Sequence, residues 1–219
     1  MTYNMPSVLG ETKKATAMVF TPKTEKPANG WRVVVWEHGT VGIGDSCAPS
    51  NNAFNPRFKA MAESLLAAGY VIVAPDYEGL GTAGIHPYLN LNSAAKSAKY
   101  AVDAYKAHYG QNANGAWMSV GQSQGGHASL GTAEFMNGDS AYKGAVAAAP
   151  ASSLGYIIAD VAPLAIQQVL AGEMAGVVPQ GTSIAIYAEL LAYAAYTTVG
   201  IKAYEPRFNY QELFGDRSK

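Results

Sequence analysis

The chain has 219 residues, of which 49% are hydrophobic and 14% charged, which fits one globular domain with a sizeable core and excludes a disordered chain. The formal net charge of −1 leaves no basic field for nucleic acid or an acidic membrane surface. A single cysteine, Cys47, excludes an internal disulfide and a CxxC metal or redox pair.

The N-terminal part predicts two strands. Met1–Gly10 has neither the basic nor the apolar region of a signal peptide. Ala15–Phe20 is the first predicted strand, and Thr21–Gly30, with two prolines and a glycine, is a turn-rich connection. Trp31–Trp36 is a nearly continuous apolar stretch, as expected of an inner strand that is covered on both faces.

Helical and strand patterns then alternate along the chain. Phe58–Leu66 predicts a helix, which Gly69 ends, and Tyr70–Ala74 predicts the next strand. A glycine-containing loop follows, and apolar residues from Ala94 to Tyr109 recur at helical spacing.

The same alternation continues to about residue 150. Ala116–Val120 predicts a strand, Ala128–Phe135 a helix and Gly144–Ala149 a further strand. Strands that alternate with helices at this spacing imply a parallel sheet flanked by helices, so the predicted fold class is α/β.

The alternation stops after Ser152. The segments Val161–Met174, Ser183–Val199 and Asn209–Phe214 predict helices. We therefore expect a core over residues 1–151 and a helical cap or lid over 152–219, with a helical tail packed on the core as the alternative. The most apolar part, 184–199, is short for a transmembrane span and contains Glu189, so we expect no membrane-spanning segment.

One serine lies between the fourth of these strands and its helix. Residues 120–126 read Val-Gly-Gln-Ser-Gln-Gly-Gly, which is the G-x-S-x-G pattern of a nucleophile elbow. Gly121 and Gly125 lack the Cβ atoms that would clash in so sharp a turn, and Ser123 would sit at a helix N-terminus, which favours negative charge nearby. An incidental serine in a glycine-rich turn is the alternative.

Three stretches together resemble the secretory lipase family, the lipase A type of the α/β-hydrolase fold. They are Glu37-His38-Gly39-Thr40 with 45–50, then 75–81 with His86-Pro87-Tyr88-Leu89, then the serine turn. The likeness covers about residues 31–150, the N-terminal part of that fold. Members of the family hydrolyse carboxylic esters, often of lipids, and carry a helical cap after the sixth strand.

The resemblance implies roles for three residues. Ser123 would be the nucleophile, and the backbone amides of Gln124 and Thr40 would bind the oxyanion of a tetrahedral intermediate. Thr40 could instead be an ordinary loop residue. The resemblance also implies a small-molecule or lipid ester substrate, an apolar cap that binds the acyl chain, and a secreted or periplasmic protein.

The base and acid of a catalytic triad are not evident in this sequence. In this fold the order is serine, acid, histidine, and all four histidines lie at or before His127. The family's last strands also have no counterpart here, so we expect the acid and histidine in a C-terminal portion of the same protein. His127 as base and Asp160 as acid are the local alternatives.

The remaining patterns indicate no cofactor or metal. The sequence has no P-loop, no G-x-G-x-x-G and no H-E-x-x-H, and its histidines are scattered. The leading hypothesis is a serine ester hydrolase that acts through an acyl-enzyme on Ser123. A serine peptidase or acyltransferase and a non-catalytic, complementing fragment stay open as alternatives.

Overall fold

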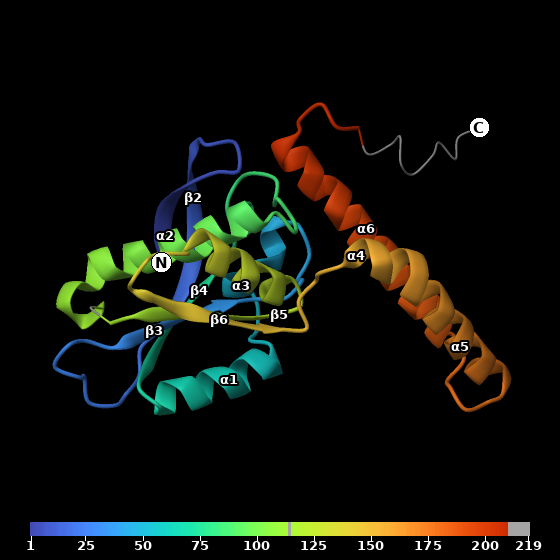
Figure 1. Cartoon of the computed structure of the whole chain (residues 1–219), viewed down its shortest axis with the longest axis horizontal. Coiled ribbons are helices and arrows are strands. Elements are labelled where there is room, and N and C mark those ends of the chain that lie inside the picture. Colours follow the sequence, from blue (N-terminus) through green and yellow to red (C-terminus); the bar gives the residue numbers. More distant parts are fainter. Residues whose placement is uncertain (114, 210–219) are drawn as a thin grey trace.

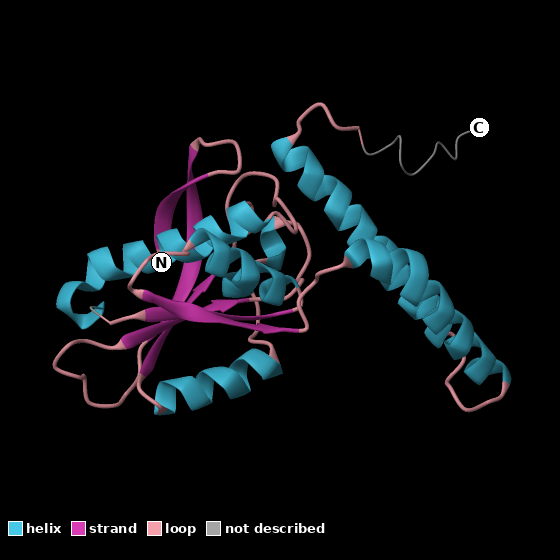
Figure 2. Ribbon diagram, viewed as in Figure 1, coloured by secondary structure: helices cyan, strands magenta, loops and turns pink. Residues whose placement is uncertain are grey.

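The computed structural model describes residues 1–113 and 115–209, and its centre is a twisted sheet of six strands (Figures 1 and 2). The strands are β1 (Thr2–Pro6), β2 (Thr12–Phe20), β3 (Arg32–Glu37), β4 (Tyr70–Pro75), β5 (Trp117–Gln122) and β6 (Tyr142–Ala148). Their order across the sheet is β1-β2-β4-β3-β5-β6. The predicted α/β class is confirmed.

The sheet is mixed rather than wholly parallel. Strands β4, β3, β5 and β6 pair in parallel, as predicted, whereas β1 pairs antiparallel with β2, and β2 antiparallel with β4. The parallel prediction is wrong for these first two strands. The loop between β1 and β2 is too short for a crossover connection, which accounts for the antiparallel pairing of these two. The sequence analysis also missed β1, although Tyr3 and Met5 alternate with exposed neighbours.

Helices cover both faces of the sheet. They are α1 (Pro56–Ala67), α2 (Leu91–Tyr109) and α3 (Gln124–Phe135), and Figure 1 shows α1 on one face with α2 and α3 on the other. Asn55 caps α1 by accepting from the backbone N–H of Arg57, and Asn90 caps α2 in the same way through Ser93. Short 3₁₀ turns, Asp45–Cys47, Pro49–Asn51 and Gly110–Ala113, lie in the connections.

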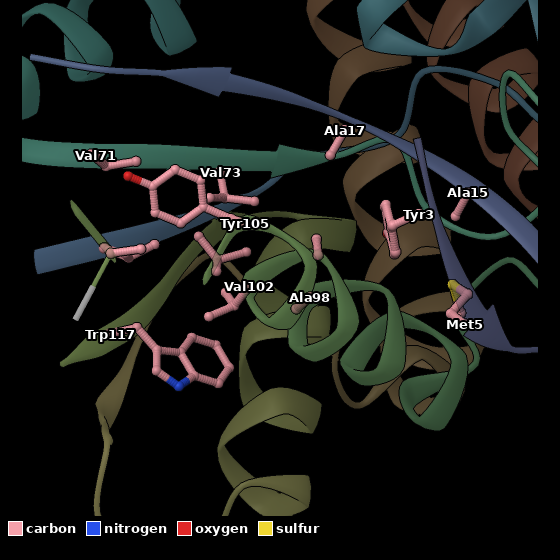
Figure 3. Packing of buried hydrophobic residues seen from close by; sticks show 14 of the residues in the cluster. Tyr3, Met5, Ala15, Ala17, Val71, Val73, Ala98, Val102, Tyr105 and Trp117 are labelled. Carbon is pink, nitrogen blue, oxygen red and sulfur yellow. The ribbon is translucent and has the colours of Figure 1, made fainter. Parts of the chain in front are cut away.

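The larger core lies between the sheet and α2. Val33 and Val35 of β3 point to this face together with Val71 and Val73 of β4, and Ala98, Val102 and Tyr105 of α2 pack against them (Figure 3). The side chains on the opposite face of β3 meet α1, where Phe58, Ala62 and Ile72 form a second cluster beside Trp36. Continuous apolar strands are therefore buried on both faces, as predicted for β3.

The C-terminal helices form a hairpin that extends away from the sheet (Figure 1). Its first arm contains α4 (Leu154–Tyr156), a π-helical turn (Ile157–Val161) and α5 (Ala162–Met174), and its second arm is α6 (Thr182–Tyr204). Glu173 holds the arms together, because its carboxylate accepts from the backbone N–H of Ser183 at 2.5 Å, at the start of α6.

Contacts with Tyr88 fasten the hairpin to the core. Gly200 of α6 lies directly on the backbone of Tyr88, since a Cβ at Gly200 would be 2.6 Å from the Tyr88 carbonyl oxygen. The rings of Tyr88 and Tyr196 also meet edge to face, with their centroids 5.9 Å apart. The hairpin therefore sits at the end of the sheet where β3 and β5 finish.

Both arms are longer than the sequence analysis expected. Leu154–Met174 and Thr182–Tyr204 have the length and composition of a membrane span, and little of either is buried. The argument from length against a span is therefore wrong for α6. The helix predicted over 209–214 lies, apart from Asn209, outside the described residues.

Candidate functional site

Ser123 lies in the turn that joins β5 directly to α3. Its backbone has φ 59° and ψ −119°, a conformation that costs energy for any residue other than glycine. The Ser123 N–H donates to the Ala148 carbonyl at 3.0 Å, and its carbonyl accepts from the N–H of His127. The end of β6 and the first turn of α3 thus hold the strained residue in place.

Two glycines make this turn possible. A Cβ at Gly121 would lie 2.0 Å from the carbonyl oxygen of Gly125, and a Cβ at Gly125 would lie 1.8 Å from the carbonyl oxygen of Glu37. Both distances are far below van der Waals contact, and both neighbours are backbone atoms that cannot rotate away. The close approach of β3, β5 and α3 therefore requires glycine at both positions.

The end of β3 lies next to the serine. A Cβ at Gly39 would be 3.6 Å from the Cβ of Ser123. The Tyr77 hydroxyl donates to the His38 carbonyl at 3.0 Å, and the hydroxyls of Thr40 and Tyr88 are hydrogen-bonded at 2.8 Å. The segment 38–40 is thus held from two sides, and sequence reasoning missed the part that Tyr88 plays in this.

A cavity of about 550 Å³ opens at this point. Ser123, Thr40 and His38 line it, and Trp36, Phe54 and Phe58 contribute an aromatic wall. Of the hairpin, only Tyr193 lines it, so the described residues place most of this cavity in the core rather than in the cap. Its size is that of a small-molecule site.

The side chain of Gln124 is anchored beneath the serine. Gln124 and His86 are both buried, and Gln124 Nε2 lies 3.0 Å from His86 Nε2 while His86 Nδ1 lies 2.8 Å from the carbonyl oxygen of Glu78. Burial lowers the pKa of His86 to about 4, so the ring is neutral at pH 7. The carbonyl then fixes the proton on Nδ1, and Nε2 accepts from the Gln124 amide.

A buried carboxyl group lies behind the serine turn. Glu37 ends β3 and is fully buried, and it accepts hydrogen bonds from Ser129 at 2.6 Å and Thr132 at 2.7 Å, both on α3. Burial raises the pKa of Glu37 to about 8, and the two hydroxyl donors only partly oppose this shift. Glu37 thereby ties β3 to the helix that follows Ser123, and a polar residue that ends an apolar strand was its only sequence signal.

The alternatives His127 and Asp160, and the nearby His38, are all placed away from the Ser123 hydroxyl or bonded to other groups. The Nε2 atom of His127 is 3.1 Å from the Leu89 carbonyl oxygen, and both ring nitrogens of His38 lie near backbone carbonyls. Asp160 is exposed in the π-helical turn of the hairpin. Within the described part of the chain, the Ser123 hydroxyl forms no hydrogen bond with any of these side chains.

The carboxylate of Asp76 holds neighbouring segments together. Its carboxylate accepts from the Thr16 hydroxyl at 2.7 Å and from the backbone N–H and hydroxyl of Ser50 at 2.9 and 2.6 Å. These bonds join the loop after β3 to the end of β4. Over residues 1–113 and 115–209, no three His, Cys, Asp or Glu side chains are close enough together to hold a metal ion.

Comparisons with known proteins find likeness in structure alone. No protein-family model matches the sequence, and no curated protein matches it. A hydrolase, so named only provisionally, from Legionella pneumophila superposes with a TM-score of 0.66 at 21% identity, over 96% of this chain and 53% of that one. Candida antarctica lipase A gives a TM-score of 0.55 at 18% identity, over 66% of this chain and 35% of that one.

A third structure shows higher identity over a similar part. The rice cell wall degrading esterase LipA from Xanthomonas oryzae is 26% identical, with a TM-score of 0.49, over 64% of this chain and 37% of that one. This chain thus spans between about a third and a half of the length of these structures. The sheet order, the placement of its helices and the two superpositions above a TM-score of 0.5 agree that this chain has the α/β-hydrolase fold.

Proposed function

We propose that this chain carries the nucleophile and the oxyanion-binding amides of a serine carboxylic ester hydrolase of the lipase A type. The observation that carries the proposal is the strained turn at Ser123, which lies at the start of α3, beside the end of β3 and on the wall of the 550 Å³ cavity. Backbone strain at a half-buried serine that lines a cavity is typical of a functional residue rather than a structural one.

The proposed reaction has two steps. The Ser123 hydroxyl oxygen attacks the ester carbonyl carbon, and the hydroxyl proton passes through a base to the departing alcohol. Water then attacks the acyl-enzyme, releases the carboxylic acid and returns the proton to Ser123. The amides of Gln124 and Thr40 would stabilise the oxyanion of each tetrahedral intermediate by about 3 kcal/mol apiece.

The catalytic base and acid have no candidate bonded to Ser123 among the described residues. His38, His86 and His127 each have a ring nitrogen close to a backbone carbonyl oxygen, and none is bonded to Ser123. We therefore assign the catalytic histidine and acid to a further portion of the same protein. The outer edge of β6, where such a portion could add a strand, supports this assignment.

The proposal also covers the hairpin and the cellular location of the protein. We assign residues 152–204 the role of a lid over the cavity, since Tyr193 lines it and Gly200 contacts Tyr88. Export from the cell is proposed from the resemblance of 31–150 to secretory lipases.

The test is substitution of Ser123 in the complete protein. Ser123→Ala should lower the turnover of p-nitrophenyl esters by at least about 10³-fold, because the nucleophile is lost while the fold is kept. Ser152→Ala, an exposed serine just after β6, is the matched control and should keep full activity. Ester turnover that survives Ser123→Ala would refute the proposal, and faster cleavage of an amide or transfer to an alcohol would favour a peptidase or an acyltransferase.

A further inference from the structure

The cavity beside Ser123 has a wall with a distinct chemical character. The ring centroids of Trp36 and Phe58 are 5.8 Å apart, and those of Phe54 and Phe58 are also 5.8 Å apart. Phe58 is buried beneath the other two, whereas Phe54 is 52% exposed although its ring already meets Phe20 and Phe58. One side of an aromatic cluster is thus open toward the cavity that contains Ser123.

Aromatic rings pack best against other rings. They prefer offset or edge-to-face contacts at centroid distances of about 4.5–7 Å, which an aliphatic group of equal size does not reproduce. Both pairs lie within this distance range: Phe54 and Phe58 meet edge to face at 71°, and Trp36 and Phe58 are tilted at 39°. A further ring at the open side of Phe54 would extend the same arrangement.

Polar residues also line the cavity, some of them from the same segment as Phe54 and Phe58. Asn52, Asn55 and Arg57 line it from the exposed loop and the first turn of α1, and Ser123 and Thr40 lie at the ends of β5 and β3. An ester that places its carbonyl at Ser123 would share one cavity with the aromatic wall of Trp36, Phe54 and Phe58.

We propose that this cavity binds the acyl group of the substrate and that it favours an acyl group that ends in an aromatic ring. The proposal rests on the proposed ester hydrolase activity and deepens it. It also moves the acyl site from the cap, where sequence reasoning placed it, to the core beside α1.

The first test measures binding without turnover. 3-Phenylpropanoate and 3-cyclohexylpropanoate have the same carbon count and charge, so their dissociation constants compare a ring with an aliphatic group of similar size. In the complete protein with Ser123→Ala, the phenyl compound should bind about 2- to 10-fold more tightly. Cys47 lines the same cavity and is half-buried, so the compound should also slow alkylation of Cys47, followed by mass spectrometry of its peptide.

Variants at Phe54 locate the effect. Phe54→Leu should keep binding of the cyclohexyl compound and abolish the preference for the phenyl compound, and Phe54→Ala should weaken both. Phe135→Ala removes a phenylalanine of similar exposure at the end of α3, outside the cavity lining, and should change neither constant.

The outcomes separate this inference from the proposed function. Equal binding of the two compounds, or a preference that Phe54→Leu leaves unchanged, would overturn the acyl site even if esters are hydrolysed through Ser123. A Phe54-dependent preference in a protein without ester turnover would support the site and refute the proposed function.

Discussion

At the scale of single residues, buried polar groups around Ser123 are the least expected feature of this chain. Glu37, His86 and Gln124 are buried, and each has a hydrogen-bond partner on a separate element. Such groups are costly to bury unless they are paired, so they fix one arrangement of the elements that carry them. Among the described residues Glu37 forms no ion pair, and its two hydrogen-bond partners are hydroxyl groups that can donate or accept.

The pKa of Glu37 predicts how stability depends on pH. Its pKa is raised to about 8 in the folded protein, whereas an unfolded glutamate titrates near 4.3, so the folded state binds more protons between these values. The free energy of unfolding should therefore fall as pH rises from about 4.5 to 8, by up to about 1.4 kcal/mol per pH unit from this group. Urea unfolding at several pH values measures the slope.

Glu37→Gln should remove this part of the slope, because glutamine does not titrate and can still bond to Ser129 and Thr132. Glu63→Gln is the matched control. Glu63 is exposed on α1, and its carboxylate oxygen lies 4.0 Å from Lys59 Nζ in a surface ion pair, which contributes little to stability. If Glu37→Gln leaves the slope unchanged, the pH dependence of stability does not come from Glu37.

At the scale of elements, backbone contact between β3, β5 and α3 builds the site. β3 and β5 pair in register with Glu37 opposite Gly121, and a single residue, Ser123, separates the end of β5 from the start of α3. The helix can follow so closely only because Gly125 allows its first turn to touch the backbone of Glu37. The elements thus meet through main-chain atoms, where a single added methyl group matters.

Gly125→Ala should destabilise the chain severely. Its Cβ would lie 1.8 Å from the Glu37 carbonyl oxygen, and relief of this clash requires α3 to move away from β3. We expect a loss of about 3 kcal/mol or more in the free energy of unfolding, the upper end for overpacking. Gly155→Ala is the control, since it meets no atom within 4 Å and lies in the helical α4, and it should be neutral or slightly stabilising. Equal stability of the two variants would show that the contact of α3 with β3 is looser than described.

At the scale of the whole molecule, the distribution of apolar surface is uneven. The sheet and its three helices bury most of their large apolar residues, with exceptions such as Leu130 and Phe135 on α3. The hairpin of α5 and α6 leaves more of its large apolar side chains exposed, with Leu164 at 62%, Met174 at 83% and Ile184 at 73%. Apolar surface of this extent is unusual on a monomer and marks a region that is covered by another surface.

The uncovered hairpin should make the 219-residue chain self-associate. Leu164→Lys together with Ile184→Lys should lower the apparent mass in size-exclusion chromatography with light scattering, because charge opposes apolar contact. The control pair, Leu9→Lys with Phe135→Lys, adds the same charge at exposed apolar positions outside the hairpin and should have little effect. A wild-type chain that stays monomeric at high concentration would contradict the expectation.

Sequence patterns were sufficient for local structure and for the placement of Ser123. The run from Trp31 to Trp36, the helical spacing of 94–109 and the glycines around Ser123 each encode a conformation through their own sterics and apolar periodicity. β1 was missed because two alternating apolar residues are a weak signal. α6 was predicted to end at Val199, whereas in the structure the helix continues through the following glycine and lysine to Tyr204.

Tertiary structure alone decided which residues surround Ser123. Tyr88 meets Thr40 across 48 residues, Gln124 meets His86 across 38, and Glu37 meets Thr132 across 95. Such pairs depend on the order of strands in the sheet and on the packing of α3 and of the loop before α2, for which local sequence carries no signal. The sequence by itself therefore determined where the strained serine turn lies along the chain, and the packing of distant segments determined the cavity beside Ser123 and the buried groups around it.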